Sequence, residues 1–229
     1  MTDHVVLVHG AWHGAWCWEP VIPHLEQHGL TVHTVDLPSS GSGGTLADDA
    51  EAVRAAVAAV GDQVVLVGHS YGGMAISEAS AGAATVDHLV YVTAFLLPAG
   101  LSLLDAVGGT APPWWIVDEN AGTVGVTDPV AVFFEDVDEP TRNAAVARLS
   151  PQSLASFQGR LTGAGWTEHP STYVVGEVDA AIPPVAQEAM SASAGTVRRL
   201  ATGHSPFLVR PAELAELIAE AAGRGGAQA

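Results

Sequence analysis

The 229-residue sequence contains no lysine, a single cysteine and no long apolar run. Its eight basic residues are all arginines, and 25 acidic residues outnumber them, which gives a formal net charge of −17 at pH 7. A surface of this charge repels nucleic acids and anionic membranes, so we exclude both as partners. A membrane-spanning helix needs about 20 consecutive apolar residues, and no stretch approaches this length. The single Cys17 excludes an internal disulfide.

The amino-terminal residues also lack the basic segment and longer apolar stretch of a secretory signal, since the apolar run at 5–8 has only four residues. We therefore expect a cytoplasmic protein. The length, with 48% hydrophobic residues, predicts one α/β domain with a sizeable core. Nothing in the sequence indicates the oligomeric state.

The stretch VVLVGHSYGG at 64–73 contains the most informative pattern of the chain. Its first four apolar residues, three of them β-branched, predict a buried strand of a parallel sheet. Gly68, Ser70 and Gly72 then form the pattern Gly-x-Ser-x-Gly, and an apolar helical pattern follows. Such a turn exposes the serine hydroxyl above the positive end of the next helix. A glycine-rich turn without catalytic function is the alternative, but the flanking strand and helix favour Ser70 as a nucleophile.

A second loop, near the amino terminus, is the predicted partner of this turn in binding the carbonyl oxygen of a substrate. A short apolar strand at 4–8 is followed directly by His9, Gly10 and Ala11. Acyl transfer needs two backbone N–H groups directed at the carbonyl oxygen as it becomes negative. We assign these groups to Ala11 and to Tyr71, the residue after the nucleophile. An ordinary loop between a strand and a helix is the alternative interpretation.

The remaining catalytic candidates follow the last two predicted strands, at 171–176 and 195–200. His204 lies in the loop after the second of these strands, where it could serve as the general base. An acid just beyond the carboxyl end of the first strand could orient its imidazole. Two acids compete there, Glu177 and Asp179. We prefer Asp179, which lies three residues before an Ile-Pro pair.

Between a predicted strand at 86–92 and residue 167, the alternation of strands and helices is lost. Segment 95–166 is rich in proline and aromatic residues and shows short helical patterns, which predicts a small helical lid over the site. Trp114 and Trp115 are candidates to line an apolar substrate pocket, as is Trp12 beside the first oxyanion loop, although packing within the lid explains the first two equally well. The predicted core comprises residues 1–94 and 167–229. Besides the strands already named, we expect it to contain a helical region at 16–29, a strand at 31–35 and helices at 46–60 and 211–222. A frayed Gly-rich tail follows the last helix.

No group of His, Cys, Asp or Glu has the spacing of a metal site, and no lysine follows the Gly/Ser-rich loop at 36–44 as in a nucleotide-binding P-loop. We therefore expect neither a metal nor a cofactor.

Taken together, these motifs resemble the α/β-hydrolase superfamily over essentially the whole chain. The residues that carry the resemblance are His9-Gly10-Ala11-Trp12, Gly68-His69-Ser70-Tyr71-Gly72-Gly73, Asp179 before Ile182-Pro183, and Gly203-His204. More narrowly, the chain is similar to the plant methyl esterases and hydroxynitrile lyases and their bacterial serine esterase relatives. This resemblance implies a mostly parallel sheet flanked by helices, and it supports Asp179 as the acid. The lyases of the group carry a threonine in place of Gly10 and a lysine in place of Ser205, which argues against cyanohydrin cleavage.

The predicted function is a cofactor-independent serine esterase that cleaves a small or medium, largely apolar carboxylic ester through an acyl-enzyme. Two other functions stay open. The same triad could serve a lyase, or an acyl-transfer or cyclisation enzyme of secondary metabolism. It could also persist in a ligand-binding protein of negligible turnover.

Overall fold

The computed structural model describes residues 2–41 and 43–224; the end of the predicted frayed tail, 225–229, lies outside them. Six strands form one parallel sheet in the order β2-β1-β3-β4-β8-β9. The strands are β1 (His4–Val8), β2 (Thr31–Val35), β3 (Val64–His69), β4 (Val86–Val92), β8 (Ser171–Gly176) and β9 (Thr196–Leu200). This arrangement confirms the predicted α/β fold with its parallel central sheet.

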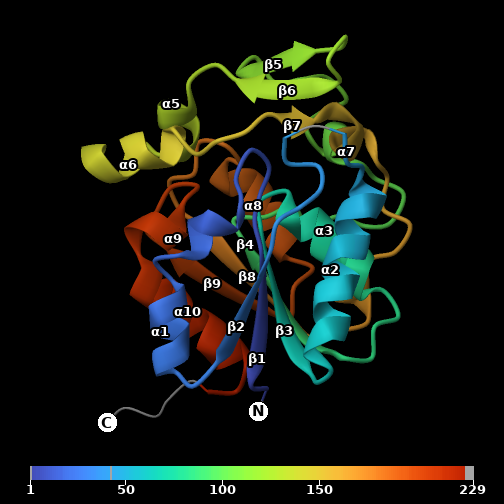
Figure 1. The fold of residues 1–229 in the computed structure, drawn as a ribbon, viewed down its shortest axis with the longest axis vertical. Coiled ribbons are helices and arrows are strands. Elements are labelled where there is room, and N and C mark those ends of the chain that lie inside the picture. The colour runs from blue at the N-terminus through green and yellow to red at the C-terminus, as the bar shows by residue number, and fades with distance from the viewer. Residues whose placement is uncertain (1, 42, 225–229) are drawn as a thin grey trace.

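Helices cover both faces of this sheet because its strands are apolar on both sides. Alternate residues of β1 and β3 pack in two separate clusters: Val6 and Leu66 lie in one, and Val5 and Val65 lie in the other. The first face is covered by α2 (Leu46–Val60), α3 (Gly72–Ser80) and α8 (Pro184–Ser191), the second by α1 (Ile22–Gln27), α9 (Pro206–Val209) and α10 (Pro211–Ala221) (Figure 1).

The helical region expected at 16–29 is interrupted. It consists of a 3₁₀ helix, η1 (Ala15–Trp18), and the short α1 that begins at Ile22. Pro20 and Pro23 explain the break, because proline lacks the N–H that a continuous helix would need and restricts the residue before it.

The segment between β4 and β8 is not wholly helical, contrary to our expectation for the lid. It holds a second, antiparallel sheet of three strands, β5 (Trp115–Asp118), β6 (Thr123–Val126) and β7 (Gln152–Ser153). Its helices are short: α4 (Leu103–Ala106), α5 (Pro129–Phe133), α6 (Glu139–Val146), α7 (Leu154–Gln158) and the 3₁₀ helix η2 (Gly165–Thr167). The hairpin escaped prediction because its strands have only four residues each, among prolines that suggest loops.

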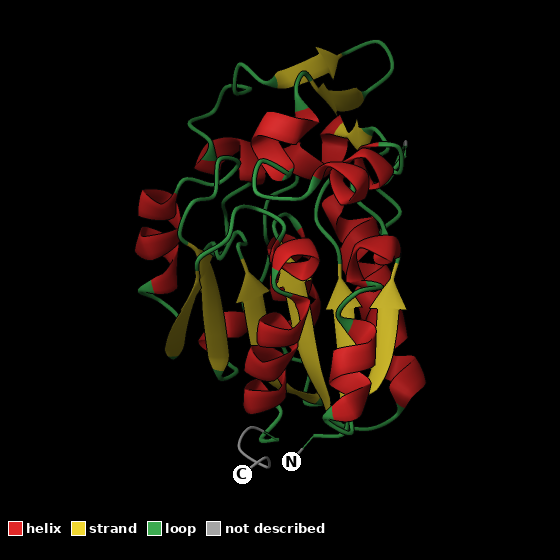
Figure 2. Cartoon of the chain, turned by 90° about the vertical axis from the view of Figure 1, so that its left-hand side faces the viewer, coloured by secondary structure: helices red, strands yellow, loops and turns green. Residues whose placement is uncertain are grey.

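The small sheet and α5 and α6 lie beyond the carboxyl ends of the core strands, as Figures 1 and 2 show from two directions. In a parallel α/β sheet, this is the edge at which ligands bind. The structure therefore places the small sheet, α5 and α6 at the edge at which the predicted catalytic loops meet.

Candidate active site

Ser70 lies at the turn between β3 and α3 with a left-handed backbone, φ 52°. This conformation is strained for a residue with a side chain, and surrounding contacts must hold it in place. The backbone N–H of Ser70 donates to Val92 O at 3.2 Å, and its carbonyl accepts from Gly73 N at 3.0 Å. These bonds secure the turn between the carboxyl end of the sheet and the start of the helix.

Glycine is required around this serine because neighbouring backbones approach closely. A Cβ at Gly68 would lie 2.7 Å from Gly72 O, and one at Gly72 would lie 2.6 Å from His9 O. A Cβ at Gly10 would lie 2.7 Å from Ser70 Cβ. The two loops are therefore packed against each other without space for a methyl group.

His204 is bonded to Asp179 and not to Glu177. The Nδ1 of His204 lies 2.8 Å from Asp179 Oδ2, and both side chains are buried. The Glu177 side chain is exposed, whereas Asp179 is 4% exposed. Since Asp179 accepts at Nδ1, the Nε2 of His204 is the nitrogen that remains for proton transfer. Within the described ranges, no direct hydrogen bond links Ser70 Oγ to His204.

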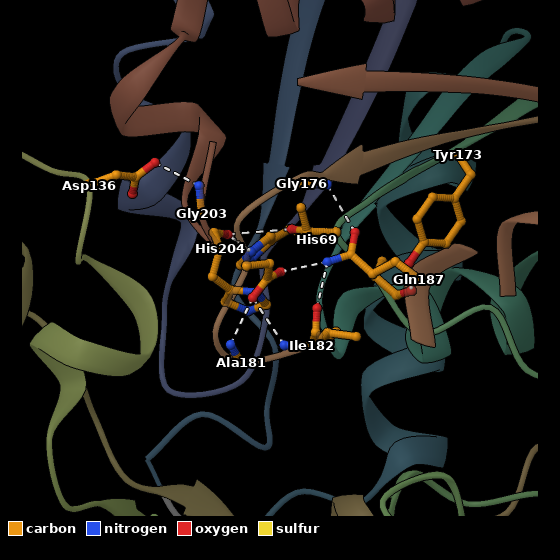
Figure 3. Close-up of polar contacts among 12 residues, drawn as sticks. His69, Asp136, Tyr173, Gly176, Ala181, Ile182, Gln187, Gly203 and His204 are labelled. Carbon is orange, nitrogen blue, oxygen red and sulfur yellow. Dashed lines mark hydrogen bonds and ion pairs between the residues drawn. The ribbon is translucent and has the colours of Figure 1, made fainter. Parts of the chain in front are cut away.

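Asp179 is held by a set of donors that the sequence did not reveal. Its Oδ1 accepts the N–H groups of Ala181 and Ile182 at 2.8 and 3.0 Å, and its Oδ2 accepts Gln187 Nε2 at 2.8 Å. Gln187 lies in α8, is fully buried, and also binds Ile182 O and Gly176 N, as Figure 3 shows. These bonds fix the position of the carboxylate and compensate its burial.

Burial disfavours the charged form of three further histidines close to the site. Burial lowers the pKa of His13 to about 3 and the pKa of His69 well below its ordinary value, and it also lowers the pKa of His9. Each has a specific bond: His9 Nδ1 lies 2.8 Å from Gly10 O, His13 Nδ1 lies 2.8 Å from Ala11 O, and His69 Nε2 lies 2.9 Å from His204 O (Figure 3). His9 Nε2 accepts from Leu37 N, so its Nδ1 carries the proton. Together these three histidines hold the backbone of the loop at residues 9–11 and of His204.

The two predicted oxyanion donors are available for a ligand. In the described part of the chain, the backbone N–H groups of Ala11 and Tyr71 have no hydrogen-bond acceptor, although both residues are buried. Buried N–H groups without an acceptor are rare and costly. Both residues line the same pocket as Ser70 and His204.

This pocket has about 380 Å³ of space, part of it open to solvent, and its wall is mostly aromatic and aliphatic. Trp12, Trp114 and Trp115, the three predicted pocket residues, all line it. None of its described lining residues is an arginine, aspartate or glutamate. Besides the residues already named, the pocket is lined by Phe95, Leu103, Val107, Pro112, Phe133, Phe157, Ala181 and Ile182.

The described residues contain no group of three or more His, Cys, Asp or Glu side chains placed to hold a metal ion. No helix among them is long and apolar enough to cross a membrane.

A family model described as the alpha/beta hydrolase family matches residues 5–217. The chain belongs to this family. It is 30% identical over 240 residues to alpha/beta hydrolase nvfD of Aspergillus novofumigatus, which covers 96% of each chain. It is 41% identical over 105 residues to methylesterase 3 of Arabidopsis thaliana, covering 41% of this chain and 40% of the relative. The resemblance to the plant methyl esterase group is thus confirmed.

Among solved structures, a pyrethroid hydrolase, PytH, superposes on this alpha/beta hydrolase with a TM-score of 0.84 and 25% identity, over 97% of this chain and 98% of the other. The family and these relatives indicate an enzyme of the alpha/beta hydrolase class.

Proposed function

We propose that this protein is a serine esterase that hydrolyses a small or medium, largely apolar carboxylic ester, with Ser70, His204 and Asp179 as its catalytic triad. The observation that carries the proposal is the buried Asp179–His204 pair, whose imidazole lines a pocket that is also lined by Ser70 and by Ala11 and Tyr71, the two residues whose N–H groups have no acceptor among the described residues. Nucleophile, base, orienting acid and oxyanion donors are the parts that acyl transfer needs.

The reaction follows from this geometry. His204 Nε2 accepts the proton of Ser70 Oγ as that oxygen attacks the carbonyl carbon of the ester. The N–H groups of Ala11 and Tyr71 stabilise the negative carbonyl oxygen. The alcohol leaves with the proton from His204, and an acyl group remains on Ser70. Water then repeats the attack by the same base and releases the acid.

The pocket wall supports an apolar substrate. Its residues offer aromatic and aliphatic surface and no permanently charged side chain, so a charged acyl group would lose its hydration without gaining a partner. The names of methylesterase 3 and of the pyrethroid hydrolase are consistent with a hydrolytic function.

The test is the hydrolysis of a panel of p-nitrophenyl and methyl esters of increasing acyl length. We expect Ser70→Ala to lower turnover by about 10⁴-fold or more, since the remaining groups cannot form an acyl-enzyme. The matched control is Ser193→Ala, a change of an exposed serine that does not line the pocket, which should leave turnover unchanged. Turnover that survives Ser70→Ala, or a wild-type protein inert on every ester, would contradict the proposal.

A further inference from the structure

The residue after the predicted oxyanion donor Ala11 has an unusual backbone. Trp12 has φ 63°, a left-handed conformation that costs about 1–2 kcal/mol for a residue with a side chain. Three hydrogen bonds hold Trp12 in this conformation, and all three partners belong to segment 95–166, between β4 and β8. Its N–H donates to Gln152 Oε1 at 3.2 Å, its carbonyl accepts from Ser150 N at 2.9 Å, and its indole Nε1 donates to Val124 O at 2.7 Å.

These bonds secure the loop that carries the donor. Both polar ends of the Ala11–Trp12 peptide are bonded, its carbonyl to His13 Nδ1 and its N–H to Gln152. The carbonyl of the preceding Gly10–Ala11 peptide accepts from His9 Nδ1. Within the described residues, only the Ala11 N–H of these two peptides has no partner, and it belongs to a residue that lines the pocket.

Gln152 is itself fixed in one orientation. It lies in β7, is 1% exposed, and its Nε2 donates to Ser39 Oγ at 2.7 Å and to Ser156 Oγ at 2.8 Å. Because the Trp12 N–H can only donate, it requires the amide oxygen, which leaves the amide nitrogen to the two serine hydroxyls. A buried amide with both ends bonded is a rigid support.

The same network reaches the second predicted donor. Ser39 N donates to Asp49 Oδ1 at 2.9 Å, and the Tyr71 hydroxyl donates to Asp49 Oδ2 at 2.5 Å. The chain of buried bonds thus runs from Trp12 through Gln152, Ser39 and Asp49 to Tyr71. This chain of bonds joins the two loops that supply the oxyanion donors, and Gln152 is the member of the chain that belongs to segment 95–166.

We propose that Gln152 is a positioning residue for the oxyanion hole: it holds Trp12 in its left-handed conformation and so fixes the Ala11 N–H relative to that of Tyr71. This inference rests on the proposed function. Without an acceptor for its N–H, Trp12 relaxes to a right-handed or extended backbone, and the Ala11 donor moves with it. A displacement of about 1 Å at a catalytic group costs on the order of 10²-fold in rate.

Three variants test this role. Gln152→Leu removes every bond of the amide at similar side-chain volume. Gln152→Glu keeps an oxygen that accepts the Trp12 N–H but loses the amide donors. The Ser39 hydroxyl can rotate to donate to the new carboxylate, whereas the Ser156 hydroxyl already donates to Ser153 O. Gln158→Leu is the matched control, since Gln158 is exposed in the adjacent α7 and does not line the pocket.

For each variant we would measure kcat and KM on the ester of the panel with the highest kcat/KM. We would also measure the melting temperature and the Ki of an aryl trifluoromethyl ketone. The Ser70 hydroxyl adds reversibly to the carbonyl carbon of this ketone, and the resulting hemiketal places a negative oxygen where the oxyanion of the reaction forms. The kcat values are expressed per Ser70 site that a fluorophosphonate labels, so that unfolded protein does not count.

We expect Gln152→Leu to lower kcat by about 10²-fold and to raise the ketone Ki in parallel, with little change in KM. Gln152→Glu should lower the melting temperature, because it buries a carboxylate, yet keep kcat and Ki near those of the wild type. Gln158→Leu should change neither the melting temperature nor kcat nor the ketone Ki. If kcat instead follows the melting temperature across the variants, or Gln152→Leu keeps kcat and Ki, the positioning role is wrong while a Ser70-dependent esterase stands. Turnover independent of Ser70 would overturn both proposals.

Discussion

The Asp179 carboxylate receives four donors, which are His204 Nδ1, Gln187 Nε2 and two backbone N–H groups. With all of its bonds directed inward, it cannot rotate away from the imidazole. Asp179→Asn replaces the oxygen that accepts from His204 by a group that donates, so the imidazole takes the other tautomer. We expect kcat/KM to fall by about 10⁴-fold with the fold intact, measured by ester hydrolysis and circular dichroism.

The matched control is Glu177→Gln, which makes the same acid-to-amide change at an exposed side chain two residues away. It should leave kcat/KM unchanged. If it were Glu177→Gln that abolished turnover, the acid of the triad would be misassigned.

At the scale of elements, β5 and the residue before it bring two tryptophans to the pocket. Trp115 is buried, with its ring 4.6 Å from that of Phe157, and Trp114 is half-buried, with its ring 5.5 Å from that of Trp12. Exchange of either for alanine should enlarge the pocket and shift the preference toward longer acyl chains more than it lowers turnover of short ones. The measurement is the kcat/KM profile over the ester panel. Trp166→Ala removes a half-buried tryptophan that does not line the pocket and should leave this profile unchanged. An unaltered profile in the two pocket variants would assign both side chains to packing.

The elements of the core could be predicted from the sequence because local patterns specify them. The strand at 4–8 and the helix at 46–60 have the predicted bounds, since apolar runs and the Thr45–Asp48 capping box are encoded within a few residues. The hairpin of β5 and β6 has no such clear pattern. Gln152 and Gln187 could not be found at all, because Gln152 meets Trp12 across 140 residues of sequence and Gln187 is an unremarkable residue in an ordinary helix. Patterns can predict where a strand ends, but not which distant amide supports the loop that follows.

For the whole molecule, the buried histidines make stability depend on pH. His9, His13 and His69 all have a lowered pKa in the folded state because burial disfavours their charged form. In the unfolded chain, a histidine has a pKa of about 6.5 and binds a proton below that value. The unfolded state therefore binds more protons than the folded state below about pH 6.5, and acid favours unfolding. Asp49 acts in the opposite sense, because burial raises its pKa in the folded state and the folded protein then binds the additional proton.

We therefore expect the free energy of unfolding to be nearly constant above about pH 7 and to fall as the pH drops from about 6.5 to 5. His13, whose pKa in the folded state is about 3, contributes a slope that approaches about 1.4 kcal/mol per pH unit. Urea unfolding at pH 7.5, 6.5 and 5.5 measures it, in a range where most of the 25 acidic side chains stay ionised. His13→Gln keeps a side chain that can donate to Ala11 O but cannot bind a proton, so it should reduce the slope by up to about 1.4 kcal/mol per pH unit. Stability that is the same at all three pH values, or a slope unchanged by His13→Gln, would mean that these histidines are protonated in the folded protein or do not dominate its response to acid.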